Sequence, residues 1–477
     1  MTVEKQALVG LKWTGIAKLV GQIISWGVTV LVLRLLVPSD YGLMAIVAAI
    51  IGVLASVAEF GFGVSLVQAQ QLSRSDLGAV TGAVIISNVS IGVLVTVLAP
   101  VAAWFYSEPR LTLLVEVASL HFLFSAVGTV PQALAYRRMN FGWLARTEVV
   151  AVVTSGLATL GLAWHGYGVW ALLMGSLLQT FIRTALLLSQ GMPRPTFRLR
   201  GLRQHAIFGG TFTVTRLVSQ VAYESDIFIA GRLLPHEAIG LYSVSLHLAT
   251  LPMQKIMGVI NQVILPAAAR LQQERERLRL RMIEATRILI LFSLPVLWGL
   301  SAVAPEFVRT IMGPQWGDAV FPLQIICVAI PLRMLNAVYT TVAIGVGNMR
   351  VNVFNTVASA IVLPSTFYVG AHWGADGLAF AWVIAIPFVF FCFLPRVLRI
   401  VDLRLSDLLR SLRVPAAAGA FMYAAVGLGR LACEGLSVAV RLPLLIVLGA
   451  AVYIGVVLLL DRRVVVDVLR ILRAMRA

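Results

Sequence analysis

Apolar blocks of about twenty residues alternate with short polar links along almost the whole chain. A block of that length crosses a hydrocarbon layer of about 30 Å as a helix. Lipid offers no hydrogen-bond partner to backbone N–H and C=O groups, so helices are the expected form. The pattern predicts an all-α membrane protein with about fourteen transmembrane helices. The predicted spans are residues 13–36, 41–66, 78–104, 111–134, 145–164, 168–190, 206–230, 238–265, 285–304, 319–342, 353–371, 376–395, 414–432 and 442–460.

Composition agrees with this pattern. Only 12% of the 477 residues are charged and 59% are hydrophobic, whereas a soluble chain carries about a quarter charged residues. The net charge of +17 lies mainly in the links between apolar blocks, where it signals topology rather than nucleic-acid binding. Arginines concentrate in alternate links, which predicts an even number of spans with both termini in the cytoplasm.

An internal repeat divides the chain. Arg34-Leu35-Leu36 and Gly42-Leu43 match Arg232-Leu233-Leu234 and Gly240-Leu241 at an offset of 198 residues. Two copies of a six-helix unit in the same orientation are typical of transporters that rock two lobes around a central cavity. The predicted organisation is an N-lobe at 1–190, a basic cytoplasmic linker at 191–205, a C-lobe at 206–400, and two further spans with a basic tail at 401–477.

Polar residues within the spans are candidates for function because they are costly in lipid. Lys18 and Gln22 in the first span match Arg216 and Gln220 in the seventh at the same offset, and Lys255 and Arg333 add further positive charge. A cationic cavity suits a phosphate or pyrophosphate ligand, since arginine and lysine give charge-assisted hydrogen bonds to its oxygens. The alternatives are that Lys18 snorkels to the interface and that Lys255 and Arg333 form structural ion pairs.

Other polar residues at depth have simpler interpretations. The acidic ones are Glu59, Glu224 and Asp226. His121 is interpreted as a packing residue rather than a proton relay, and Arg183, late in its span, as a snorkelling side chain. No phosphate-binding loop, catalytic constellation or metal-ligand cluster stands out, so no enzyme activity, metal or other cofactor is expected.

Several motifs resemble those of the polysaccharide transporter flippases, of the Wzx-type or colanic-acid-exporter-like group within the multidrug/oligosaccharidyl-lipid/polysaccharide flippase superfamily. The resemblance covers about residues 10–400. It rests on the segments 34–43 (RLLVPSDYGL), 59–68 (EFGFGVSLVQ), 128–134 (GTVPQAL), 166–172 (GYGVWAL), 226–234 (DIFIAGRLL) and 265–271 (LPAAARL).

The resemblance implies a function. Such proteins move undecaprenyl-pyrophosphate-linked oligosaccharide units across the bacterial inner membrane for exopolysaccharide or lipopolysaccharide biosynthesis, by alternating access. It also implies coupling to H⁺ or Na⁺, for which Glu59, Glu224 and Asp226 are the candidate carboxylates. The implied partners are membrane lipids and, as an open question, the polysaccharide polymerase and chain-length proteins. The alternatives are a small-molecule exporter similar to the MATE proteins, and a polymerase or scaffold of polysaccharide assembly.

Overall fold

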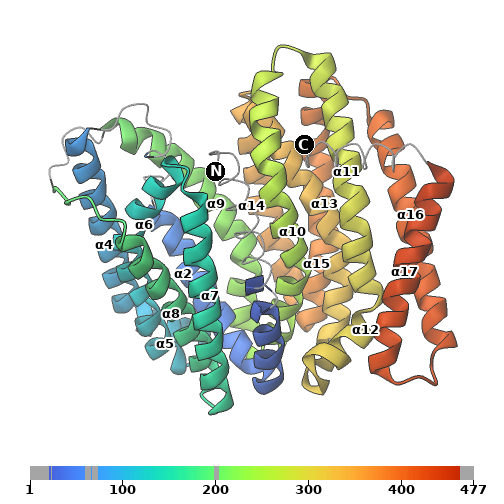
Figure 1. The fold of residues 1–477 in the computed structure, drawn as a ribbon, viewed down its shortest axis with the longest axis horizontal. Coiled ribbons are helices and arrows are strands. Elements are labelled where there is room, and N and C mark those ends of the chain that lie inside the picture. Colours follow the sequence, from blue (N-terminus) through green and yellow to red (C-terminus); the bar gives the residue numbers. More distant parts are fainter. Residues whose placement is uncertain (1–20, 23, 60–65, 67–72, 198–202, 462–477) are drawn as a thin grey trace, which may run out of the picture. The chain divides into compact units, whose positions relative to one another are not determined.

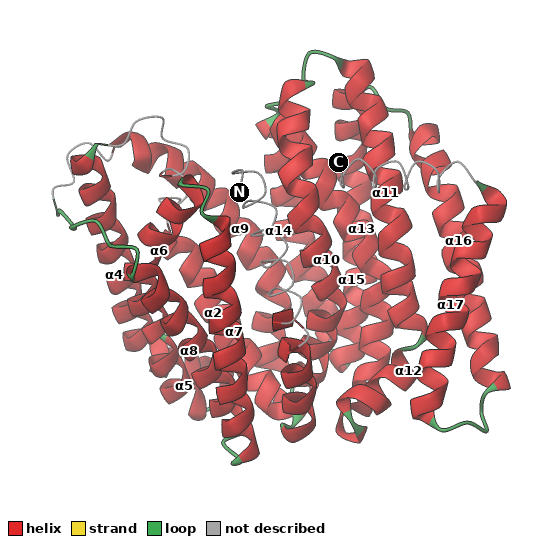
Figure 2. Cartoon of the chain, viewed as in Figure 1, coloured by secondary structure: helices red, strands yellow, loops and turns green. Residues whose placement is uncertain are grey.

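The computed structural model describes residues 21–461 except 23, 60–65, 67–72 and 198–202, and every regular element among these described residues is a helix (Figure 2). Eleven of the helices are long and apolar enough to cross a membrane. The all-α membrane fold is therefore confirmed, and the protein passes the membrane many times. The count of fourteen is not confirmed. The other three predicted spans fall on the shorter apolar helix Ile24–Leu35 and on α9 and α10, which are outside the eleven.

The chain divides into two compact units, Met1–Gly240 and Leu241–Ala477. The helices of the first unit run from blue to green in Figure 1. They are α2 (Pro38–Glu59), α4 (Arg74–Tyr106), α5 (Arg110–Ala118), α6 (Leu120–Arg137), α7 (Phe141–Trp164), α8 (Val169–Leu188), α9 (Arg203–Leu233) and the first residues of α10 (His236–Arg270). The predicted lobes at 1–190 and 206–400 stay a prediction.

Helix starts in the first unit follow from local capping chemistry. Ser73 and Asp76 form a reciprocal capping box at the start of α4, with the Asp76 N–H donating to Ser73 Oγ at 3.0 Å. A second cap is tertiary: the Val169 N–H at the start of α8 donates to Asp40 Oδ1 at 3.1 Å. A carboxylate is stabilised at a helix N-terminus by the free amides and the helix dipole. Asp40 therefore fastens α8 to the beginning of α2.

Two glycines related by the 198-residue offset contact each other in the first unit. Gly42, in the second turn of α2, lies so close to the start of α10 that a Cβ there would collide with the carbonyl oxygen of His236. A Cβ on Gly240 would collide in the same way with the carbonyl oxygen of Pro38. The two halves of the sequence repeat thus meet across a contact that only glycine permits on both sides.

A carboxylate between α4 and α5 holds the same end of the unit. Glu108 Oε1 accepts from Arg110 Nε at 2.8 Å and Glu108 Oε2 accepts from Arg110 Nη2 at 3.1 Å, and His236 Nε2 lies 3.0 Å from the same Oε2. The side-chain hydrogen bond from Arg110 is the main cause that lowers the pKa of Glu108 to about 2. Glu108 therefore ties α10 to the α4–α5 turn while it is ionised.

Glu108→Gln is expected to lower the melting temperature of the purified protein by a few degrees at pH 7. The wild-type carboxylate, with its lowered pKa, stabilises the fold fully above about pH 4.5 and loses that contribution as the pH falls toward about 2. The difference in melting temperature between the two proteins should therefore narrow over that acid range. A difference that stays constant down to pH 2 would contradict the assignment.

The second unit contains the remainder of α10 and the elements drawn in yellow to red in Figure 1. They are α11 (Arg275–Ala302), α12 (Ala304–Phe307), η1 (Val308–Met312), η2 (Pro314–Ala319), α13 (Val320–Gly345), α14 (Met349–Ala371), α15 (Gly374–Val401), α16 (Leu405–Ala432) and α17 (Val438–Leu460). Large aromatic side chains fill its core, and the buried Trp382 Nε1 donates to Tyr242 Oη at 2.7 Å.

A buried ion pair joins α12 to α16 in the second unit. Glu306 is 3% exposed and accepts two hydrogen bonds from Arg430, at 2.9 and 3.1 Å. Arg430 also donates to the carbonyl oxygen of Ala302. Removing one partner of such a pair leaves a buried, uncompensated charge, which costs about 3–5 kcal/mol. This pair therefore has a structural role, and its burial can be compared with that of the Arg216–Glu59 ion pair described below.

Candidate functional site

Arg216 forms an ion pair with Glu59 in the first unit. Arg216 lies in the middle of α9, and its Nη1 donates to Glu59 Oε2 at 2.9 Å. Unlike Glu306, both side chains are about half exposed, at 49% and 50%. Where water reaches the exposed faces, a pair with this exposure contributes about 0–1 kcal/mol, because water competes for both charges. The guanidinium is therefore held by a partner that another anion can displace at little cost.

The polar stripe predicted on the seventh span continues along α9. Gln220, one turn after Arg216, donates from Nε2 to Glu224 Oε1 at 3.0 Å. Asp226 is nearly fully buried, and its Oδ1 accepts from the Ile227 N–H at 2.7 Å. Glu224 thus faces the same helix surface as Gln220, whereas Asp226 is enclosed by protein.

The remaining predicted residues lie elsewhere. Arg333 belongs to the second unit, where its guanidinium lies 4.7 Å from the centroid of the Trp382 ring. Lys255 is an exposed residue of α10 in the same unit. Gln22 is a half-buried residue of the first unit, and Lys18 lies outside the described residues. Of the predicted set, the structure brings together Arg216 with Glu59 and Gln220 with Glu224.

A polar cavity of about 240 Å³ lies beside Glu59, entirely within the first unit. Four helices, α2, α4, α6 and α8, contribute to its wall. Nine of its twelve lining residues are polar: Glu59, Asn88, His121, Ser125, Thr129, Gln132, Thr180, Arg183 and Thr184. Polar groups of this kind are rare in membrane-spanning helices and typically mark a pathway or binding site.

The charged and amide side chains of the cavity hold one another in place. Arg183 donates from Nη2 to Gln132 Oε1 at 2.8 Å, and its Nη1 lies 3.8 Å from Glu148 Oε2. The two ring nitrogens of His121 lie 3.3 Å from Ser125 Oγ and 3.5 Å from Thr180 Oγ1. The cavity is therefore rich in both donors and acceptors. Arg183, interpreted from the sequence as a snorkelling side chain, points instead into this network.

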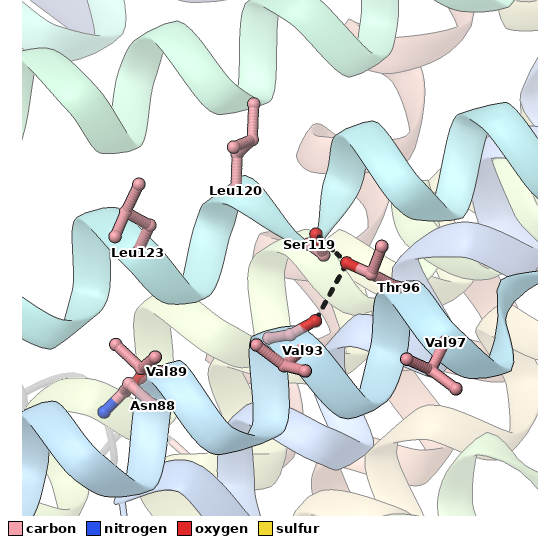
Figure 3. A pocket seen from close by; sticks show the side chains of 9 residues that line it. Asn88, Val89, Val93, Thr96, Val97, Ser119, Leu120 and Leu123 are labelled. Carbon is pink, nitrogen blue, oxygen red and sulfur yellow. Dashed lines mark hydrogen bonds between the residues drawn. The ribbon is translucent and has the colours of Figure 1, made fainter.

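The first unit also carries an apolar groove, whose lining differs from that of the polar cavity. It runs between α4 and the break between α5 and α6, and it is lined mainly by Val89, Val93, Val97, Leu120 and Leu123 (Figure 3). Its main polar contact is the hydrogen bond of 2.9 Å between Thr96 Oγ1 and Ser119 Oγ. Such a lining suits hydrocarbon chains. Asn88 lines both the groove and the polar cavity.

The sequence carries a signal for the polar cavity in residues that are not among the predicted site residues. His121, Ser125, Thr129 and Gln132 are spaced by 4, 4 and 3 residues, which places them on one face of a helix. Thr180, Arg183 and Thr184, at positions i, i+3 and i+4, likewise share one helix face in the sixth predicted span. Two polar faces within apolar spans predict a shared polar interior. Which helices share it depends on the tertiary packing.

Comparisons with known proteins agree with this architecture. The family model described as polysaccharide biosynthesis protein matches residues 31–321. The teichuronic acid biosynthesis protein TuaB of Bacillus subtilis (strain 168) is 26% identical over 398 residues, which cover 81% of this chain and 80% of TuaB. The lipopolysaccharide biosynthesis protein WzxC of Escherichia coli (strain K12) is 24% identical over 396 residues, which cover 80% of this chain and 79% of WzxC.

A solved structure shares the fold. The lipid II flippase MurJ in an inward closed conformation matches 95% of this chain and 99% of its own length, with a TM-score of 0.76 and 16% sequence identity. At this identity the match establishes the fold alone. The helices around the Arg216–Glu59 pair and the polar cavity therefore belong to a fold that this chain shares with MurJ.

Proposed function

We propose that this chain, which belongs to the polysaccharide biosynthesis protein family, is a flippase for undecaprenyl-pyrophosphate-linked oligosaccharide units in the bacterial inner membrane. Its relatives are named for the biosynthesis of teichuronic acid and lipopolysaccharide, and its fold resembles that of a lipid II flippase. These matches support transport of a lipid-linked sugar, in which no covalent bond is made or broken. We place both termini in the cytoplasm, from the distribution of arginine along the chain.

The observation that carries this proposal is the exchangeable pair of Arg216 and Glu59. A pyrophosphate accepts charge-assisted, bidentate hydrogen bonds from a guanidinium, and these are roughly twice as strong as neutral ones. The competing bond from the half-exposed Glu59 is weak. In the proposed mechanism the pyrophosphate displaces Glu59 from Arg216. Lys18, Gln22, Gln220, Lys255 and Arg333 are the further residues proposed to contact the headgroup.

The displaced Glu59 carboxylate offers a means of coupling lipid transport to an ion gradient. Once displaced from Arg216, the Glu59 carboxylate lines the polar cavity without its cationic partner, and a cation would bind there in place of the arginine. H⁺ or Na⁺ bound there would be released when Arg216 is restored, as the headgroup leaves on the periplasmic side. Glu224 and Asp226 are the other carboxylates proposed for this role. The predicted lobes at 1–190 and 206–400 would alternate in exposing the site.

A flipping assay tests the proposal directly. Purified protein is reconstituted into vesicles that contain an undecaprenyl-pyrophosphate oligosaccharide, and the glycan accessible from outside is followed with time. We expect rapid exchange between leaflets with the protein and none in matched protein-free vesicles. Vesicles with the Arg216→Ala variant serve as the second control. Equal leaflet distributions with and without protein would exclude the flippase function.

A further inference from the structure

The polar cavity of the first unit requires an occupant that can form many hydrogen bonds. Nine polar side chains line a space of about 240 Å³ among helices that otherwise bury apolar residues. A polar group without a partner costs several kcal/mol in an apolar medium. Asn88, Thr129, Thr180 and Thr184 donate to backbone carbonyl oxygens, which leaves their own side-chain oxygens as acceptors toward the space. An open polar cavity therefore holds water or a polar ligand in at least part of the transport cycle.

Charge indicates the class of ligand. The two cavity residues with permanent charge each have an opposite partner: Glu59 is bound by Arg216, and Arg183 lies beside Glu148. What remains toward the cavity is an uncharged set of hydroxyls, amides and an imidazole, in which oxygen acceptors predominate because several donors are already bonded to backbone carbonyls. This set fits a neutral ligand with many hydroxyl groups. Sugars meet that description, whereas a simple anion would find no unpaired positive charge in the cavity.

The size and position of the cavity indicate which part of a sugar-bearing ligand it can hold. A volume of about 240 Å³ is below the usual range of roughly 300–1,000 Å³ for larger ligands, so it suits one sugar ring rather than an oligosaccharide. Glu59 lines the cavity and also contacts Arg216. A group bound at Arg216 is therefore adjacent to the cavity. In an undecaprenyl-pyrophosphate glycan, the group next to the pyrophosphate is the first sugar.

We infer that this cavity binds the first sugar of the lipid-linked oligosaccharide, while Arg216 binds the pyrophosphate. The inference rests on the proposed function and adds a specificity site to it. Gln132, held in place by Arg183, and the hydroxyls of Ser125 and Thr129 are the groups that contact sugar hydroxyls. Discrimination arises because a wrong sugar leaves some of these half-buried polar groups without a partner.

Binding of two lipids to the full-length protein in nanodiscs tests this inference. The probes are undecaprenyl pyrophosphate and the lipid-linked oligosaccharide extracted from a strain deleted for this chain. Wild-type protein should bind the glycolipid at least about tenfold more tightly than the bare lipid, the effect of one or two net hydrogen bonds. Gln132→Leu and the double variant Ser125→Ala/Thr129→Val should reduce this preference to less than about threefold, with little change for the bare lipid.

Two controls keep the outcomes distinct. Thr366→Val makes the same chemical change in α14 of the second unit, where the hydroxyl donates only to carbonyl oxygens of its own helix, and it should leave the preference intact. Arg216→Ala should weaken both lipids equally and preserve their ratio. A wild-type protein that binds both lipids alike, or cavity variants that keep the full preference at normal melting temperature, would overturn the sugar site. Failure of wild-type protein to bind either lipid would instead count against the proposed function.

Discussion

Replacing Arg216 with alanine is expected to abolish complementation of a flippase-deficient strain while leaving the amount of protein in the membrane normal. Hydrogen bonds to charged groups contribute about 1.5–3 kcal/mol, so binding of undecaprenyl pyrophosphate should weaken by about ten- to a hundredfold. Arg216→Lys should recover only part of the affinity. Lysine keeps the charge but lacks the planar fork that engages two phosphate oxygens.

Glu59→Gln is expected to change the affinity for undecaprenyl pyrophosphate in the opposite direction to Arg216→Ala. If Glu59 competes with pyrophosphate for Arg216, removing its charge should strengthen binding of the bare lipid. The gain should not exceed about fivefold, because the half-exposed pair is worth at most about 1 kcal/mol. Flipping should nevertheless slow, since bound lipid is no longer displaced by the carboxylate.

The matched control for both variants is Arg146→Ala, which removes an exposed arginine of α7 in the same unit. It should leave binding and flipping unchanged. Lipid binding and flipping are measured in nanodiscs and vesicles, with protein levels checked by immunoblot. Full flipping by Arg216→Ala would assign Arg216 to a structural role. Weaker rather than stronger binding by Glu59→Gln would show that the carboxylate supports the phosphate instead of competing with it.

The positions of the helices were predictable from the sequence because each apolar block is long enough to satisfy its backbone only as a helix in lipid. The predicted span at 145–164 lies within α7 and that at 353–371 within α14. Boundaries were less predictable. The predicted span at 111–134 matches one candidate span, Arg110–Arg137, in which a turn at Ser119 separates α5 from α6. The Ser119 hydroxyl bonds there to Thr96 of α4, a tertiary contact that the sequence does not show.

The candidate site was predictable in its charges but not in its pairings. Arg216 stood out as a cation in the middle of an apolar span, yet its partner Glu59 is 157 residues away in the chain. The sequence analysis assigned the two to different roles, ligand binding and ion coupling, whereas they contact each other. Similarly, the periodic polar faces of α6 and α8 were visible as patterns. Only the packing of these helices shows that they enclose one cavity.

The repeat-related glycines give the second large prediction. Gly42→Ala and Gly240→Ala should each destabilise the protein strongly, because the new methyl group meets a backbone carbonyl rather than a flexible side chain. Overpacking of this kind costs about 1–3 kcal/mol and more where nothing can yield. We expect a clear drop in melting temperature and a loss of flipping, because separating α2 from α10 also disturbs the helix that carries Glu59.

The double variant distinguishes this contact from two independent defects. Once one methyl group has forced α2 and the first turn of α10 apart, the second finds space already open. The loss of stability in the double variant should therefore be clearly smaller than the sum of the losses in the two single variants, as is usual for residues in direct contact.

Gly161→Ala is the control, since a Cβ there would have no atom within 4 Å and would lie within α7. It should leave stability equal or higher, because alanine favours a helix over glycine by about 0.8–1 kcal/mol. Additive losses in the double variant, or a Gly42→Ala protein as stable as the control, would mean that the starts of α2 and α10 are not in firm contact. In that case, packing of the two glycines against each other would not explain why both repeats carry glycine at this position.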